Sequence, residues 1–533
     1  MNKLVFIILL LFSNHIFSQY IYSDTTWERW YGVQNEIELS GTFKHDIEHY
    51  DKGYIFHGYD GGFVTYNVYL KKTDINGYYL WERRLDVNYK KTILSIKNYN
   101  DGGLIICGAS EYNGVPNPWV AKLNACMEVE WCYIFSWPEF SYTNDIAEDH
   151  DGNIIVLTLY YGNTPDERIG LIKIAPDGEV LWKKNYATRY DYPYIWDANG
   201  YHLLISNDNH YYISGEAYWP TNNDPEQGGG FRSFFIKVDS NGEEEWVLPF
   251  GIYDNLYSAA TTSRQLSDDL FLSVGINWDS SCPLFMYYNS EGEALSFVSK
   301  RIMPETYDLA WFSSSEMINT NLFFTIWRYA YDAYDTPLTG YVVCDSLLNI
   351  ISYEERPEIL MPGNLIKTFN NKIVTVAHVK EQDDPTFWDT YLNKQNTDLT
   401  YDSVYTAWPG TYDSLCEGGV VSGFLPYSCD EIVGIDEIPS PEQYKEAQEK
   451  IAIQVQPNPG VNQATLLLEN TAKFQNIELE IFNIAGEQQY YRKLLSGIGE
   501  ISLNIANWPQ GMYFIIIRSQ GKMVGDAKLN VVR

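Results

Sequence analysis

The chain has 533 residues, of which 45% are hydrophobic and 16% are aromatic, and its acidic residues outnumber its lysines and arginines to give a formal net charge of −33. This length allows two or three domains with cores of ordinary size. So acidic a surface repels nucleic acid and anionic membranes, which excludes both as expected partners. The composition suits a soluble protein exposed to the external medium.

The first 18 residues have the features of a secretory signal peptide. Lys3 supplies a positive start, residues 4–12 form an apolar core, and Ser18 precedes the expected cleavage position at Gln19. The apolar run is too short to cross a bilayer comfortably, and no later stretch approaches the length of a transmembrane helix. We therefore expect a mature chain that leaves the cytoplasm and has no transmembrane segment.

A short phrase recurs along the chain at intervals of about fifty residues. Each copy places an Asp-Gly or Asn-Gly turn between runs of Val, Ile and aromatic residues, which is typical of β-hairpins. The clear copies run from Lys72 to Trp81, Lys122 to Trp131, Lys173 to Trp182 and Lys237 to Trp246, weaker copies lie near Asn289, Asp345 and Asn396, and a half-copy surrounds Trp27. A Trp or a turn that recurs in every repeat is expected to be structural.

Repeats of this length with several short strands favour a β-propeller. The count predicts about seven blades within residues 19–415, with six and eight as neighbouring possibilities. A ring must close to hide its strand edges, and the Trp27 half-copy can donate a strand to the blade completed near Tyr401. An open β-solenoid is the alternative, but it needs no closing half-repeat. We expect an all-β propeller closed by an N-terminal strand.

Aromatic residues gather where the repeat is interrupted. Exposed aromatic rings can stack on sugar rings or peptide groups, so these residues are candidates for ligand binding, with blade packing as the alternative interpretation. The candidates are Tyr190, Tyr192, Tyr194 and Trp196 before blade four, Trp219 in an insertion of about thirteen residues within blade four, and Trp327 in a second cluster.

Seven cysteines are an odd number for an exported chain, in which disulfides can persist. Cys416 and Cys429 bracket a Gly-rich loop and are the main candidates for a disulfide, while Cys126 and Cys132 flank one hairpin turn and form a second possible pair. The other three, Cys107, Cys282 and Cys344, lie in apolar strand segments and are expected to be buried. No Cys/His spacing indicates a zinc site.

Catalytic chemistry has little support in the sequence. There is no nucleophile elbow, phosphate-binding loop or dinucleotide fingerprint, so no catalytic residue is assigned. His45 and His49 lie four apart, but the order is not that of a zinc protease, and a solvated strand or loop is the favoured interpretation. The Asp149–Asn153 turn has alternating oxygen donors, a weak indication of calcium, although Asx-turn chemistry explains it without a metal.

Residues 416–450 form the Cys-bracketed loop and an acidic, Pro-containing linker, and residues 451–533 form a second set of short strands. Their spacing, without the fifty-residue phrase, predicts a small β-sandwich.

Specific motifs follow one another in this last segment. They are Val455-Gln456-Pro457-Asn458-Pro459, Leu479 to Gly486, Trp508 to Tyr513 with Gly511, and Lys528 to Arg533. This order resembles the type A C-terminal sorting domain of the type IX secretion system. The resemblance implies passage across the outer membrane from the periplasm, with release or attachment at the cell surface, and it implies the secretion machinery as a partner. Ala485 departs from a position that is often polar in the family. The repeat region is similar, more loosely, to propeller repeats that precede such sorting domains.

Two functions from different classes remain open. The favoured one is a non-catalytic, exported or surface-attached propeller that binds a glycan or a protein. The alternative is a secreted polysaccharide-directed hydrolase or lyase with a site in the propeller channel. The absence of a concentrated catalytic motif favours binding, whereas acidic residues that converge in the channel would favour catalysis.

Overall fold

The computed structural model describes residues 19–22, 26–32, 38–40, 46–60, 67–85, 91–112, 114–136, 141–160, 168–186, 198–220, 229–251, 256–280, 282–300, 311–328, 338–380, 388–425, 429, 432–434, 451–483, 488–519 and 522–532. The chain divides into two compact units, Met1–Ile435 and Asp436–Arg533. Among the described residues there is no helix long and apolar enough to span a membrane. The expected signal peptide, residues 1–18, lies outside the described residues.

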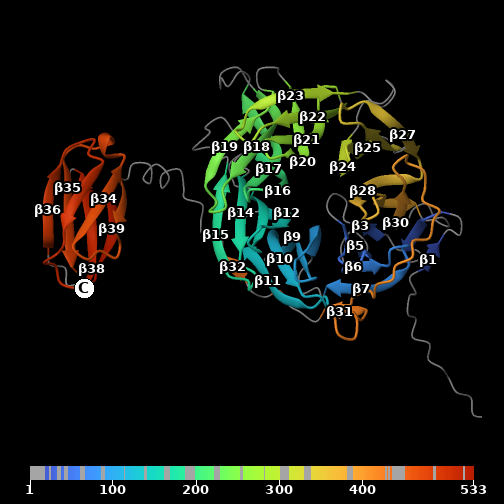
Figure 1. Cartoon of the computed structure of the whole chain (residues 1–533), viewed down its shortest axis with the longest axis horizontal. Helices are drawn as coiled ribbons and strands as arrows, with labels where there is room; N and C mark the ends of the chain where they lie inside the picture. The colour runs from blue at the N-terminus through green and yellow to red at the C-terminus, as the bar shows by residue number, and fades with distance from the viewer. Residues whose placement is uncertain are drawn as a thin grey trace, which may run out of the picture. The chain divides into compact units, whose positions relative to one another are not determined.

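The first unit is a ring of seven antiparallel sheets, so the predicted all-β, seven-bladed propeller is confirmed (Figure 1). Blade 1 has β3 (Glu38–Ser40), β4 (Ile47–Glu48), β5 (Tyr54–Asp60), β6 (Asn67–Thr73) and β7 (Tyr79–Leu85). Blade 2 has β8 (Lys91–Asn98), β9 (Leu104–Tyr112), β10 (Val115–Leu123) and β11 (Val129–Ser136). Blade 3 has β12 (Ser141–Glu148), β13 (Ile154–Tyr160), β14 (Arg168–Ile174) and β15 (Val180–Tyr186).

The remaining blades follow in chain order. Blade 4 has β16 (Ala198–Ile205), β17 (Tyr211–Pro220), β18 (Gly229–Val238) and β19 (Glu244–Pro249). Blade 5 has β20 (Ser258–Ser267), β21 (Leu270–Asn277), β22 (Cys282–Tyr288) and β23 (Ala294–Ser299). Blade 6 has β24 (Trp311–Ile318), β25 (Asn321–Arg328), β26 (Leu338–Cys344) and β27 (Ile350–Arg356), and blade 7 begins with β28 (Ile359–Lys367), β29 (Ile373–Lys380) and β30 (Trp388–Gln395).

An N-terminal strand completes the last blade, as the Trp27 half-copy predicts. β2 (Glu28–Gly32) pairs antiparallel with β30, and β1 (Gln19–Tyr22) pairs with β2 on its outer side. In this register Trp30 lies opposite Tyr391. The two ends of the propeller chain therefore share one sheet, which removes the open edge that an unclosed ring would leave.

The recurring phrase forms the turn between the third and fourth strands of blades 1 to 6, and in blade 7 it follows β30 and leads to Tyr401, which bridges back to Gln395. In each copy the turn has five residues, such as Asp74 to Tyr78. The amide of the first turn residue donates to the carbonyl of the fifth, and the amide of the fourth donates to the carbonyl of the first. The fourth residue takes a positive φ, which favours glycine. Its φ is 77° at Gly77, 96° at Gly178, 82° at Gly242 and 80° at Gly292, but Met127, Leu348 and Leu399 adopt 57°, 61° and 68° at the same position.

The tryptophan of the phrase packs on the turn of the next blade. A Cβ added to Gly292 of blade 5 would lie 2.7 Å from the Trp246 ring of blade 4, and the Trp246 indole N–H donates to the Ser290 carbonyl at 3.0 Å. Trp131 likewise donates to the Pro176 carbonyl of the following blade. The Trp of one blade thus contacts the turn Gly of the next blade, as at Trp131 with Gly178, Trp182 with Gly242 and Trp246 with Gly292.

Replacing Gly292 with Ala should destabilise the propeller by about 2 to 4 kcal/mol, because the methyl group both strains a positive φ and meets Trp246. Gly114 is the matched control, since its φ is 77° and nothing lies within 4 Å of an added Cβ. Gly114→Ala should therefore cost only the backbone strain, about 1 kcal/mol. Guanidinium unfolding of both variants measures the difference, and equal losses would show that the Trp246 contact contributes nothing.

After the last blade the chain crosses back over blades 1 and 2 as a strap, residues 401–434. β31 (Gly423–Leu425) pairs parallel with β7 of blade 1, and β32 (Ile432–Gly434) pairs parallel with β11 of blade 2. Residues 416–434, expected to be a loop and linker, therefore belong to the propeller. They extend two sheets whose outer strands would otherwise be edges.

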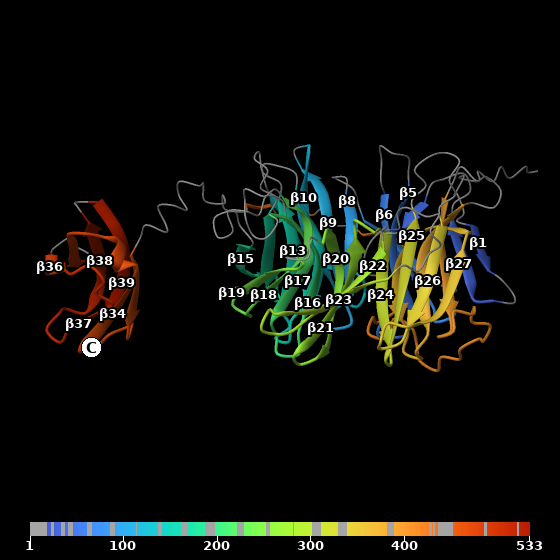
Figure 2. The ribbon, with the colours of Figure 1, turned by 90° about the horizontal axis from the view of Figure 1, so that it is seen from above.

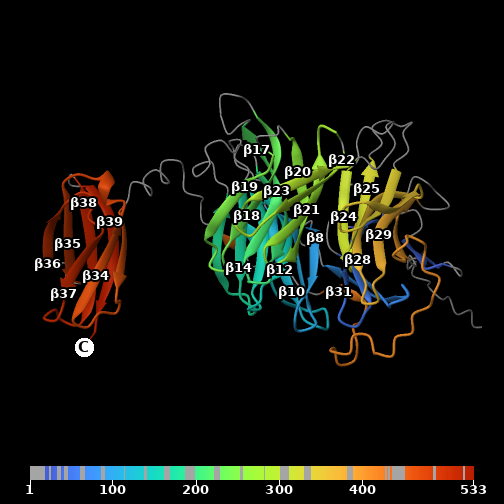
Figure 3. The ribbon, with the colours of Figure 1, turned by 45° about the horizontal axis from the view of Figure 1, so that its top comes forward.

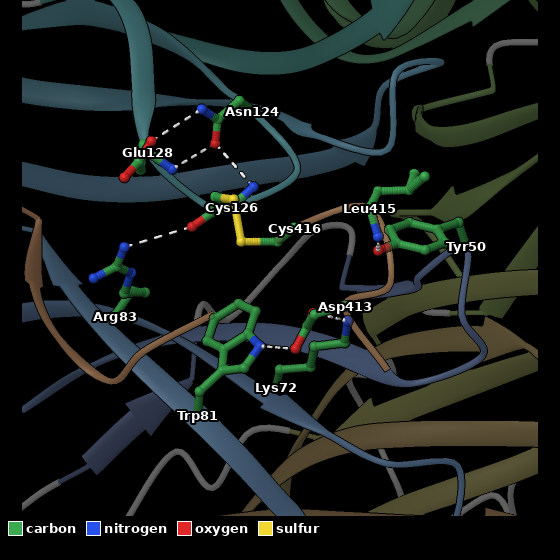
Figure 4. The surroundings of a disulfide bond; sticks show 10 residues. All are labelled: Tyr50, Lys72, Trp81, Arg83, Asn124, Cys126, Glu128, Asp413, Leu415 and Cys416. Atoms are coloured by element: carbon green, nitrogen blue, oxygen red, sulfur yellow. Dashed lines mark hydrogen bonds and ion pairs between the residues drawn. A yellow bond between two sulfur atoms is a disulfide. The ribbon is translucent and has the colours of Figure 1, made fainter. Parts of the chain in front are cut away.

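Two disulfides hold the strap to blade 2, and they correct the predicted pairing. Cys126 pairs with Cys416 (Figure 4). Cys132 pairs with Cys429, so the expected Cys416–Cys429 and Cys126–Cys132 bonds do not form. These pairs form because closure of the ring brings blade 2 beside the strap, although about 290 residues separate Cys126 from Cys416. Cys107, Cys282 and Cys344 lie outside these two disulfides and are buried, as expected.

The second unit is a two-sheet β-sandwich. One sheet has the order β33 (Ala452–Gln456), β34 (Gln463–Glu469) and β37 (Glu500–Asn504), and the other has β36 (Gln488–Leu494), β35 (Ile477–Asn483), β38 (Gly511–Ser519) and β39 (Lys522–Val531). A short 3-10 turn, η3 (Thr471–Lys473), follows β34. Alternate residues of the strands, among them Leu466, Leu479 and Ile515, fill a common core.

Candidate functional site

The two faces of the propeller differ in what they carry. Strands alternate in direction within a blade, so the first–second and third–fourth turns lie on one face, which we call the turn face. The strand ends that flank all other connections lie on the opposite face, the loop face, at the top of Figure 2. The turn face holds the repeated phrase and the strap residues around Asp413 and Cys416. The strand ends that flank the blade-four insertion, including Trp219 near the end of β17, lie at the loop face.

The structure tests only part of the predicted aromatic set. Tyr190, Tyr192, Tyr194 and Trp196 fall between β15 and β16, outside the described residues. Trp327 lies in β25, opposite Thr339 of β26, and its side chain is also outside what the structure describes. Trp219 lies near the end of β17, where it is only 4% exposed and packs in the core with Ile169. Trp219 therefore cannot offer an exposed platform, which corrects its assignment as a ligand-binding residue.

Near Trp219, one exposed ring and one half-buried ring lie on the other side of the same hairpin. The blade-four insertion is a lengthened hairpin of β17 and β18, whose strands are ten residues each (Figure 3). Adjacent residues of a strand face opposite sides, so Tyr218 points away from the core that holds Trp219. Tyr218 lies directly opposite Phe231 in the hairpin, with ring centroids 5.8 Å apart in an edge-to-face arrangement. Phe231 is 37% exposed.

A carboxyl group lies on the same side of β17 as Tyr218. The Tyr201 hydroxyl of β16 donates to Glu216 Oε1 at 2.5 Å, and Trp278, just after β21 in blade 5, is a second donor to this carboxylate. Burial raises the pKa of Glu216, although both hydrogen bonds oppose the shift. A half-buried acid with a raised pKa beside aromatic side chains is typical of functional sites. We call Tyr201, Glu216, Tyr218, Phe231 and Trp278 the hairpin cluster.

The innermost strands carry polar residues that join the blades around the axis. Asp145 of blade 3 is fully buried, accepts from Ser95 of blade 2 at 2.9 Å, and accepts from the Leu203 amide of blade 4 at 3.0 Å. Asp46 of blade 1 accepts from the amide of His57. Other links are Thr262 with Ser315, Ser314 with Asn364, and Asn364 with the Asp46 carbonyl. These two inner acids therefore have structural contacts.

One buried group has the residue types of a metal site. His49, Asp51 and Asp413 bring their ligand atoms within 4.8 Å of one another. The Lys72 ammonium lies among them, 2.5 Å from Asp51 and 3.0 Å from His49 Nδ1. It also lies 2.6 Å from Asp413 (Figure 4). A cation already fills the centre of this donor set, so the residues fit an ammonium group rather than a metal ion. His49 is buried, contrary to the solvated position expected for it.

The electrostatics of this cluster follow from its burial. Burial lowers the pKa of His49, so the imidazole is neutral at neutral pH. Burial alone would raise the pKa of Asp51, but the His49 hydrogen bond and the Lys72 ammonium together hold it well below its usual value. The Trp81 indole also donates to Asp413 at 2.9 Å. Asp413 belongs to the strap, so the cluster locks the strap to blade 1.

The Asp149 turn is built by similar contacts. Asp149 Oδ1 accepts from the amides of Asp151 and Asn153, which is an Asx turn, and Oδ2 lies 2.9 Å from the Lys173 ammonium. The hydroxyl of Tyr211 also donates to this carboxylate. The weak calcium expectation for this turn stays a prediction.

The sorting motif residues of the second unit meet at one end of the sandwich. Asn458 donates to the Lys528 carbonyl at 2.9 Å and accepts from the Asn530 amide at 2.9 Å, so its side chain joins the Pro457–Pro459 segment to the last strand. Tyr513, near Gly511 at the start of β38, is 2% exposed and donates to the Pro509 carbonyl at 2.7 Å. Gly486 lies outside the described residues.

Residues 454–530 match the family model described as the secretion system C-terminal sorting domain. The second unit is a type IX secretion sorting domain. The protein is therefore secreted or attached at the outer-membrane surface, and the secretion machinery is a partner of its sorting domain. The predicted roles of individual motif residues within the sorting domain stay predictions.

Solved structures that match the chain include several with low sequence identity. The β-propeller domain of the Trilobed protease from Pyrococcus furiosus has 11% identity and a TM-score of 0.40, over 70% of this chain and 100% of that one. Polysaccharide lyase Uly1 has 9% identity and a TM-score of 0.41, over 68% and 99%. A protein of unknown function from Bacteroides caccae has 10% identity and a TM-score of 0.32, over 51% and 85%. No curated protein matches the chain. These likenesses carry no argument about function.

Sequence reasoning missed the hairpin cluster and the strap contacts. Tyr218 and Phe231 are aromatic residues near the two ends of the predicted insertion. Because side chains alternate between the two faces of a strand, the sequence alone could have placed Tyr218 on the face opposite to that of Trp219. Asp413 had no such signal, because its partners Lys72 and Trp81 lie more than 330 residues away.

Asn458→Ala should reduce delivery of the protein to the cell surface and medium, because the substitution frees the Pro457–Pro459 segment from the last strand of the sorting domain. We expect a periplasmic pool that approaches that of a chain lacking residues 451–533. Cell fractionation with immunoblotting measures both. Asn504→Ala is the matched control, since Asn504 accepts only from the Ala506 amide within its own turn. Equal delivery of the two variants would show that the Asn458 contacts are dispensable.

Proposed function

We propose that the propeller is a non-catalytic binding module whose loop face holds a glycan or protein ligand at the cell surface, where the sorting domain delivers it. The observation that carries the proposal is the Tyr218–Phe231 pair on the β17–β18 hairpin, in which Phe231 is exposed and Tyr218 is half-buried. Flat apolar rings with polar groups beside them can stack on sugar rings. The hairpin cluster offers both, so a glycan is the favoured ligand and a protein is the alternative outcome.

The inner strands support binding rather than catalysis in the channel. A channel enzyme needs acids whose carboxylates can reach a substrate. Asp145 instead accepts hydrogen bonds from two neighbouring blades, and Asp46 is buried against His57. Removing either acid would break blade contacts, which is a structural role.

A polysaccharide-directed hydrolase or lyase is the second candidate, and Glu216 is the observation that favours it. An acid with a raised pKa can donate a proton to a leaving group near neutral pH. This would place the reaction at the loop face, not in the channel. Glu216→Gln should then abolish turnover of the ligand and leave its binding within a few-fold of the parent protein, because the amide keeps the size of the side chain.

The proposal is tested with the purified full chain on a glycan array and in protein pull-downs. Tyr218→Ala and Phe231→Ala should each weaken binding about tenfold, the effect of losing a central aromatic contact. Tyr405→Ala is the control, because Tyr405 is 70% exposed on the strap at the turn face. Unchanged binding by both hairpin variants would place the site elsewhere, and depletion of the ligand over time would favour the enzyme.

A further inference from the structure

The ring closes where the segment around Trp27 lies beside β30, and this joint repeats the geometry of blade 1. Trp27 stands opposite Lys394, whose amide donates to the Trp27 carbonyl at 3.0 Å, and Trp81 stands opposite Lys72 in the same way. In both blades the lysine ammonium lies 5.9 Å from the centre of the indole ring. Lys394 and Trp27 are therefore the blade 7 copies of Lys72 and Trp81.

In blade 1 a single carboxylate joins these two donors. Asp413 accepts from the Lys72 ammonium at 2.6 Å through Oδ1 and from the Trp81 indole at 2.9 Å through Oδ2. The lysine of the phrase also meets an acid in three further blades. These pairs are Lys122 with Asp101 at 2.6 Å, Lys173 with Asp149 at 2.9 Å and Lys237 with Glu245 at 2.7 Å. A carboxylate is thus the recurring partner of this lysine.

The donors of blade 7 have no such acceptor among the residues that the structure describes. Lys394 is fully buried and Trp27 is 3% exposed, but neither the ammonium nor the indole N–H has a hydrogen-bond partner within the described ranges. The turn between β28 and β29 places Asn370 where the corresponding turn of blade 1 has Asp51. Buried donors without an acceptor cost free energy, so an acceptor from outside the chain would stabilise this joint.

The charges around Lys394 favour an anion as that acceptor. The three acids whose charges act on Lys394 each have a cation of their own. These pairs are Asp402 with Lys372 at 2.7 Å, Glu48 with Lys52 at 3.4 Å, and Asp74 with Arg29. Burial lowers the pKa of Lys394 to about 8, although the Asp402 charge opposes the shift. Lys394 is therefore a surplus cation that still carries its charge at pH 7.

We infer that Lys394 and Trp27 bind one small monovalent anion, a halide or a short carboxylate, in the place that the Asp413 carboxylate takes in blade 1. The anion accepts from the Lys394 ammonium and from the Trp27 indole. These two donors come from opposite ends of the propeller chain, so the anion joins the ends. An anion that binds only the closed ring stabilises that ring by mass action.

Thermal unfolding of the full chain at pH 7 tests the inference. Sodium chloride or sodium acetate replaces sodium gluconate, whose anion is too large for a buried site, at constant ionic strength. The Tm of the propeller should rise by about 1 to 3 °C for each tenfold increase in chloride or acetate above the dissociation constant. Lys394→Met should abolish this rise, whereas Lys184→Met, at a lysine that joins blades 3 and 4, should keep it. An equal Tm in all three salts, or a rise that survives Lys394→Met, would overturn the inference.

Two further measurements locate the anion. In crystals grown with sodium bromide, the anomalous signal of bromide should lie within hydrogen-bond distance of Lys394 Nζ and Trp27 Nε1. Trp27→Phe keeps the ring but removes one donor, so about tenfold more anion should be needed for the same rise in Tm. The rise should also fall as the pH increases above about 8, because the neutral Lys394 amine no longer attracts an anion. A water molecule at this place with no bromide signal, or an unchanged anion dependence in Trp27→Phe, would overturn the assignment.

Discussion

Removing both disulfides of the strap should destabilise the propeller by about 9 kcal/mol, whereas removing either one alone should cost only about 3 kcal/mol. The two bonds close nearly the same loop, with sequence separations of 290 and 297 residues. In the chain-entropy view, the first bond to form removes the freedom of that long loop, worth about 5 to 6 kcal/mol. The second bond then closes a ring of only about 20 residues, worth about 3 kcal/mol.

Serine pairs measure this non-additivity. Guanidinium unfolding, without reductant, compares Cys126→Ser with Cys416→Ser, Cys132→Ser with Cys429→Ser, and the variant with all four changes. Each pair should lose about 3 kcal/mol, and the fourfold variant should lose more than their sum. Reductant should leave the fourfold variant unchanged, because that variant keeps neither disulfide of the strap. Losses that simply add would show that the two bonds act on separate segments.

The repeat allowed the fold to be predicted because the same local chemistry occurs in every blade. The turn at Asp239 and the turn at Asn289 need the same hydrogen bonds, and each needs a fourth residue that tolerates a positive φ. The closing strand was predictable for the same reason, since the Trp27 ring packs on the Gly77 turn of blade 1 as the Trp131 ring packs on the Gly178 turn of blade 3. Periodicity thus reveals interactions between neighbouring repeats.

Contacts that occur once in the ring leave no periodic signal. Cys416 was expected to pair with Cys429 because the two are close in sequence, but parallel pairing of the strap brings each to a different residue of blade 2. Trp219 was assigned to the loop-face site because it lies in the insertion. Which side of a lengthened hairpin faces the core depends on the register with neighbouring strands, and the register makes Trp219 a core residue.

Asp413→Ala should destabilise the propeller by about 3 to 5 kcal/mol, the usual cost of removing one partner from a buried ion pair. The substitution leaves the Lys72 ammonium with one carboxylate, Asp51, and with His49 Nδ1, and it leaves the Trp81 indole without its acceptor. Asp413→Asn should lose less, because the amide oxygen can still accept from Trp81. Glu417→Ala, at an exposed strap residue, is the control and should change stability by less than about 0.5 kcal/mol.

Amide hydrogen exchange locates the loss. Asp413 attaches the strap to blade 1, while the two disulfides attach it to blade 2. Asp413→Ala should therefore speed exchange first in the strap near Asp413 and in the Asp51 turn, with β10 and β11 still protected by the blade 2 contacts. Uniform loss of protection around the ring would instead mean that the cluster supports the whole propeller. Unchanged exchange in the strap would mean that the disulfides alone hold it, and the Lys72 cluster would then have no part in closing the ring.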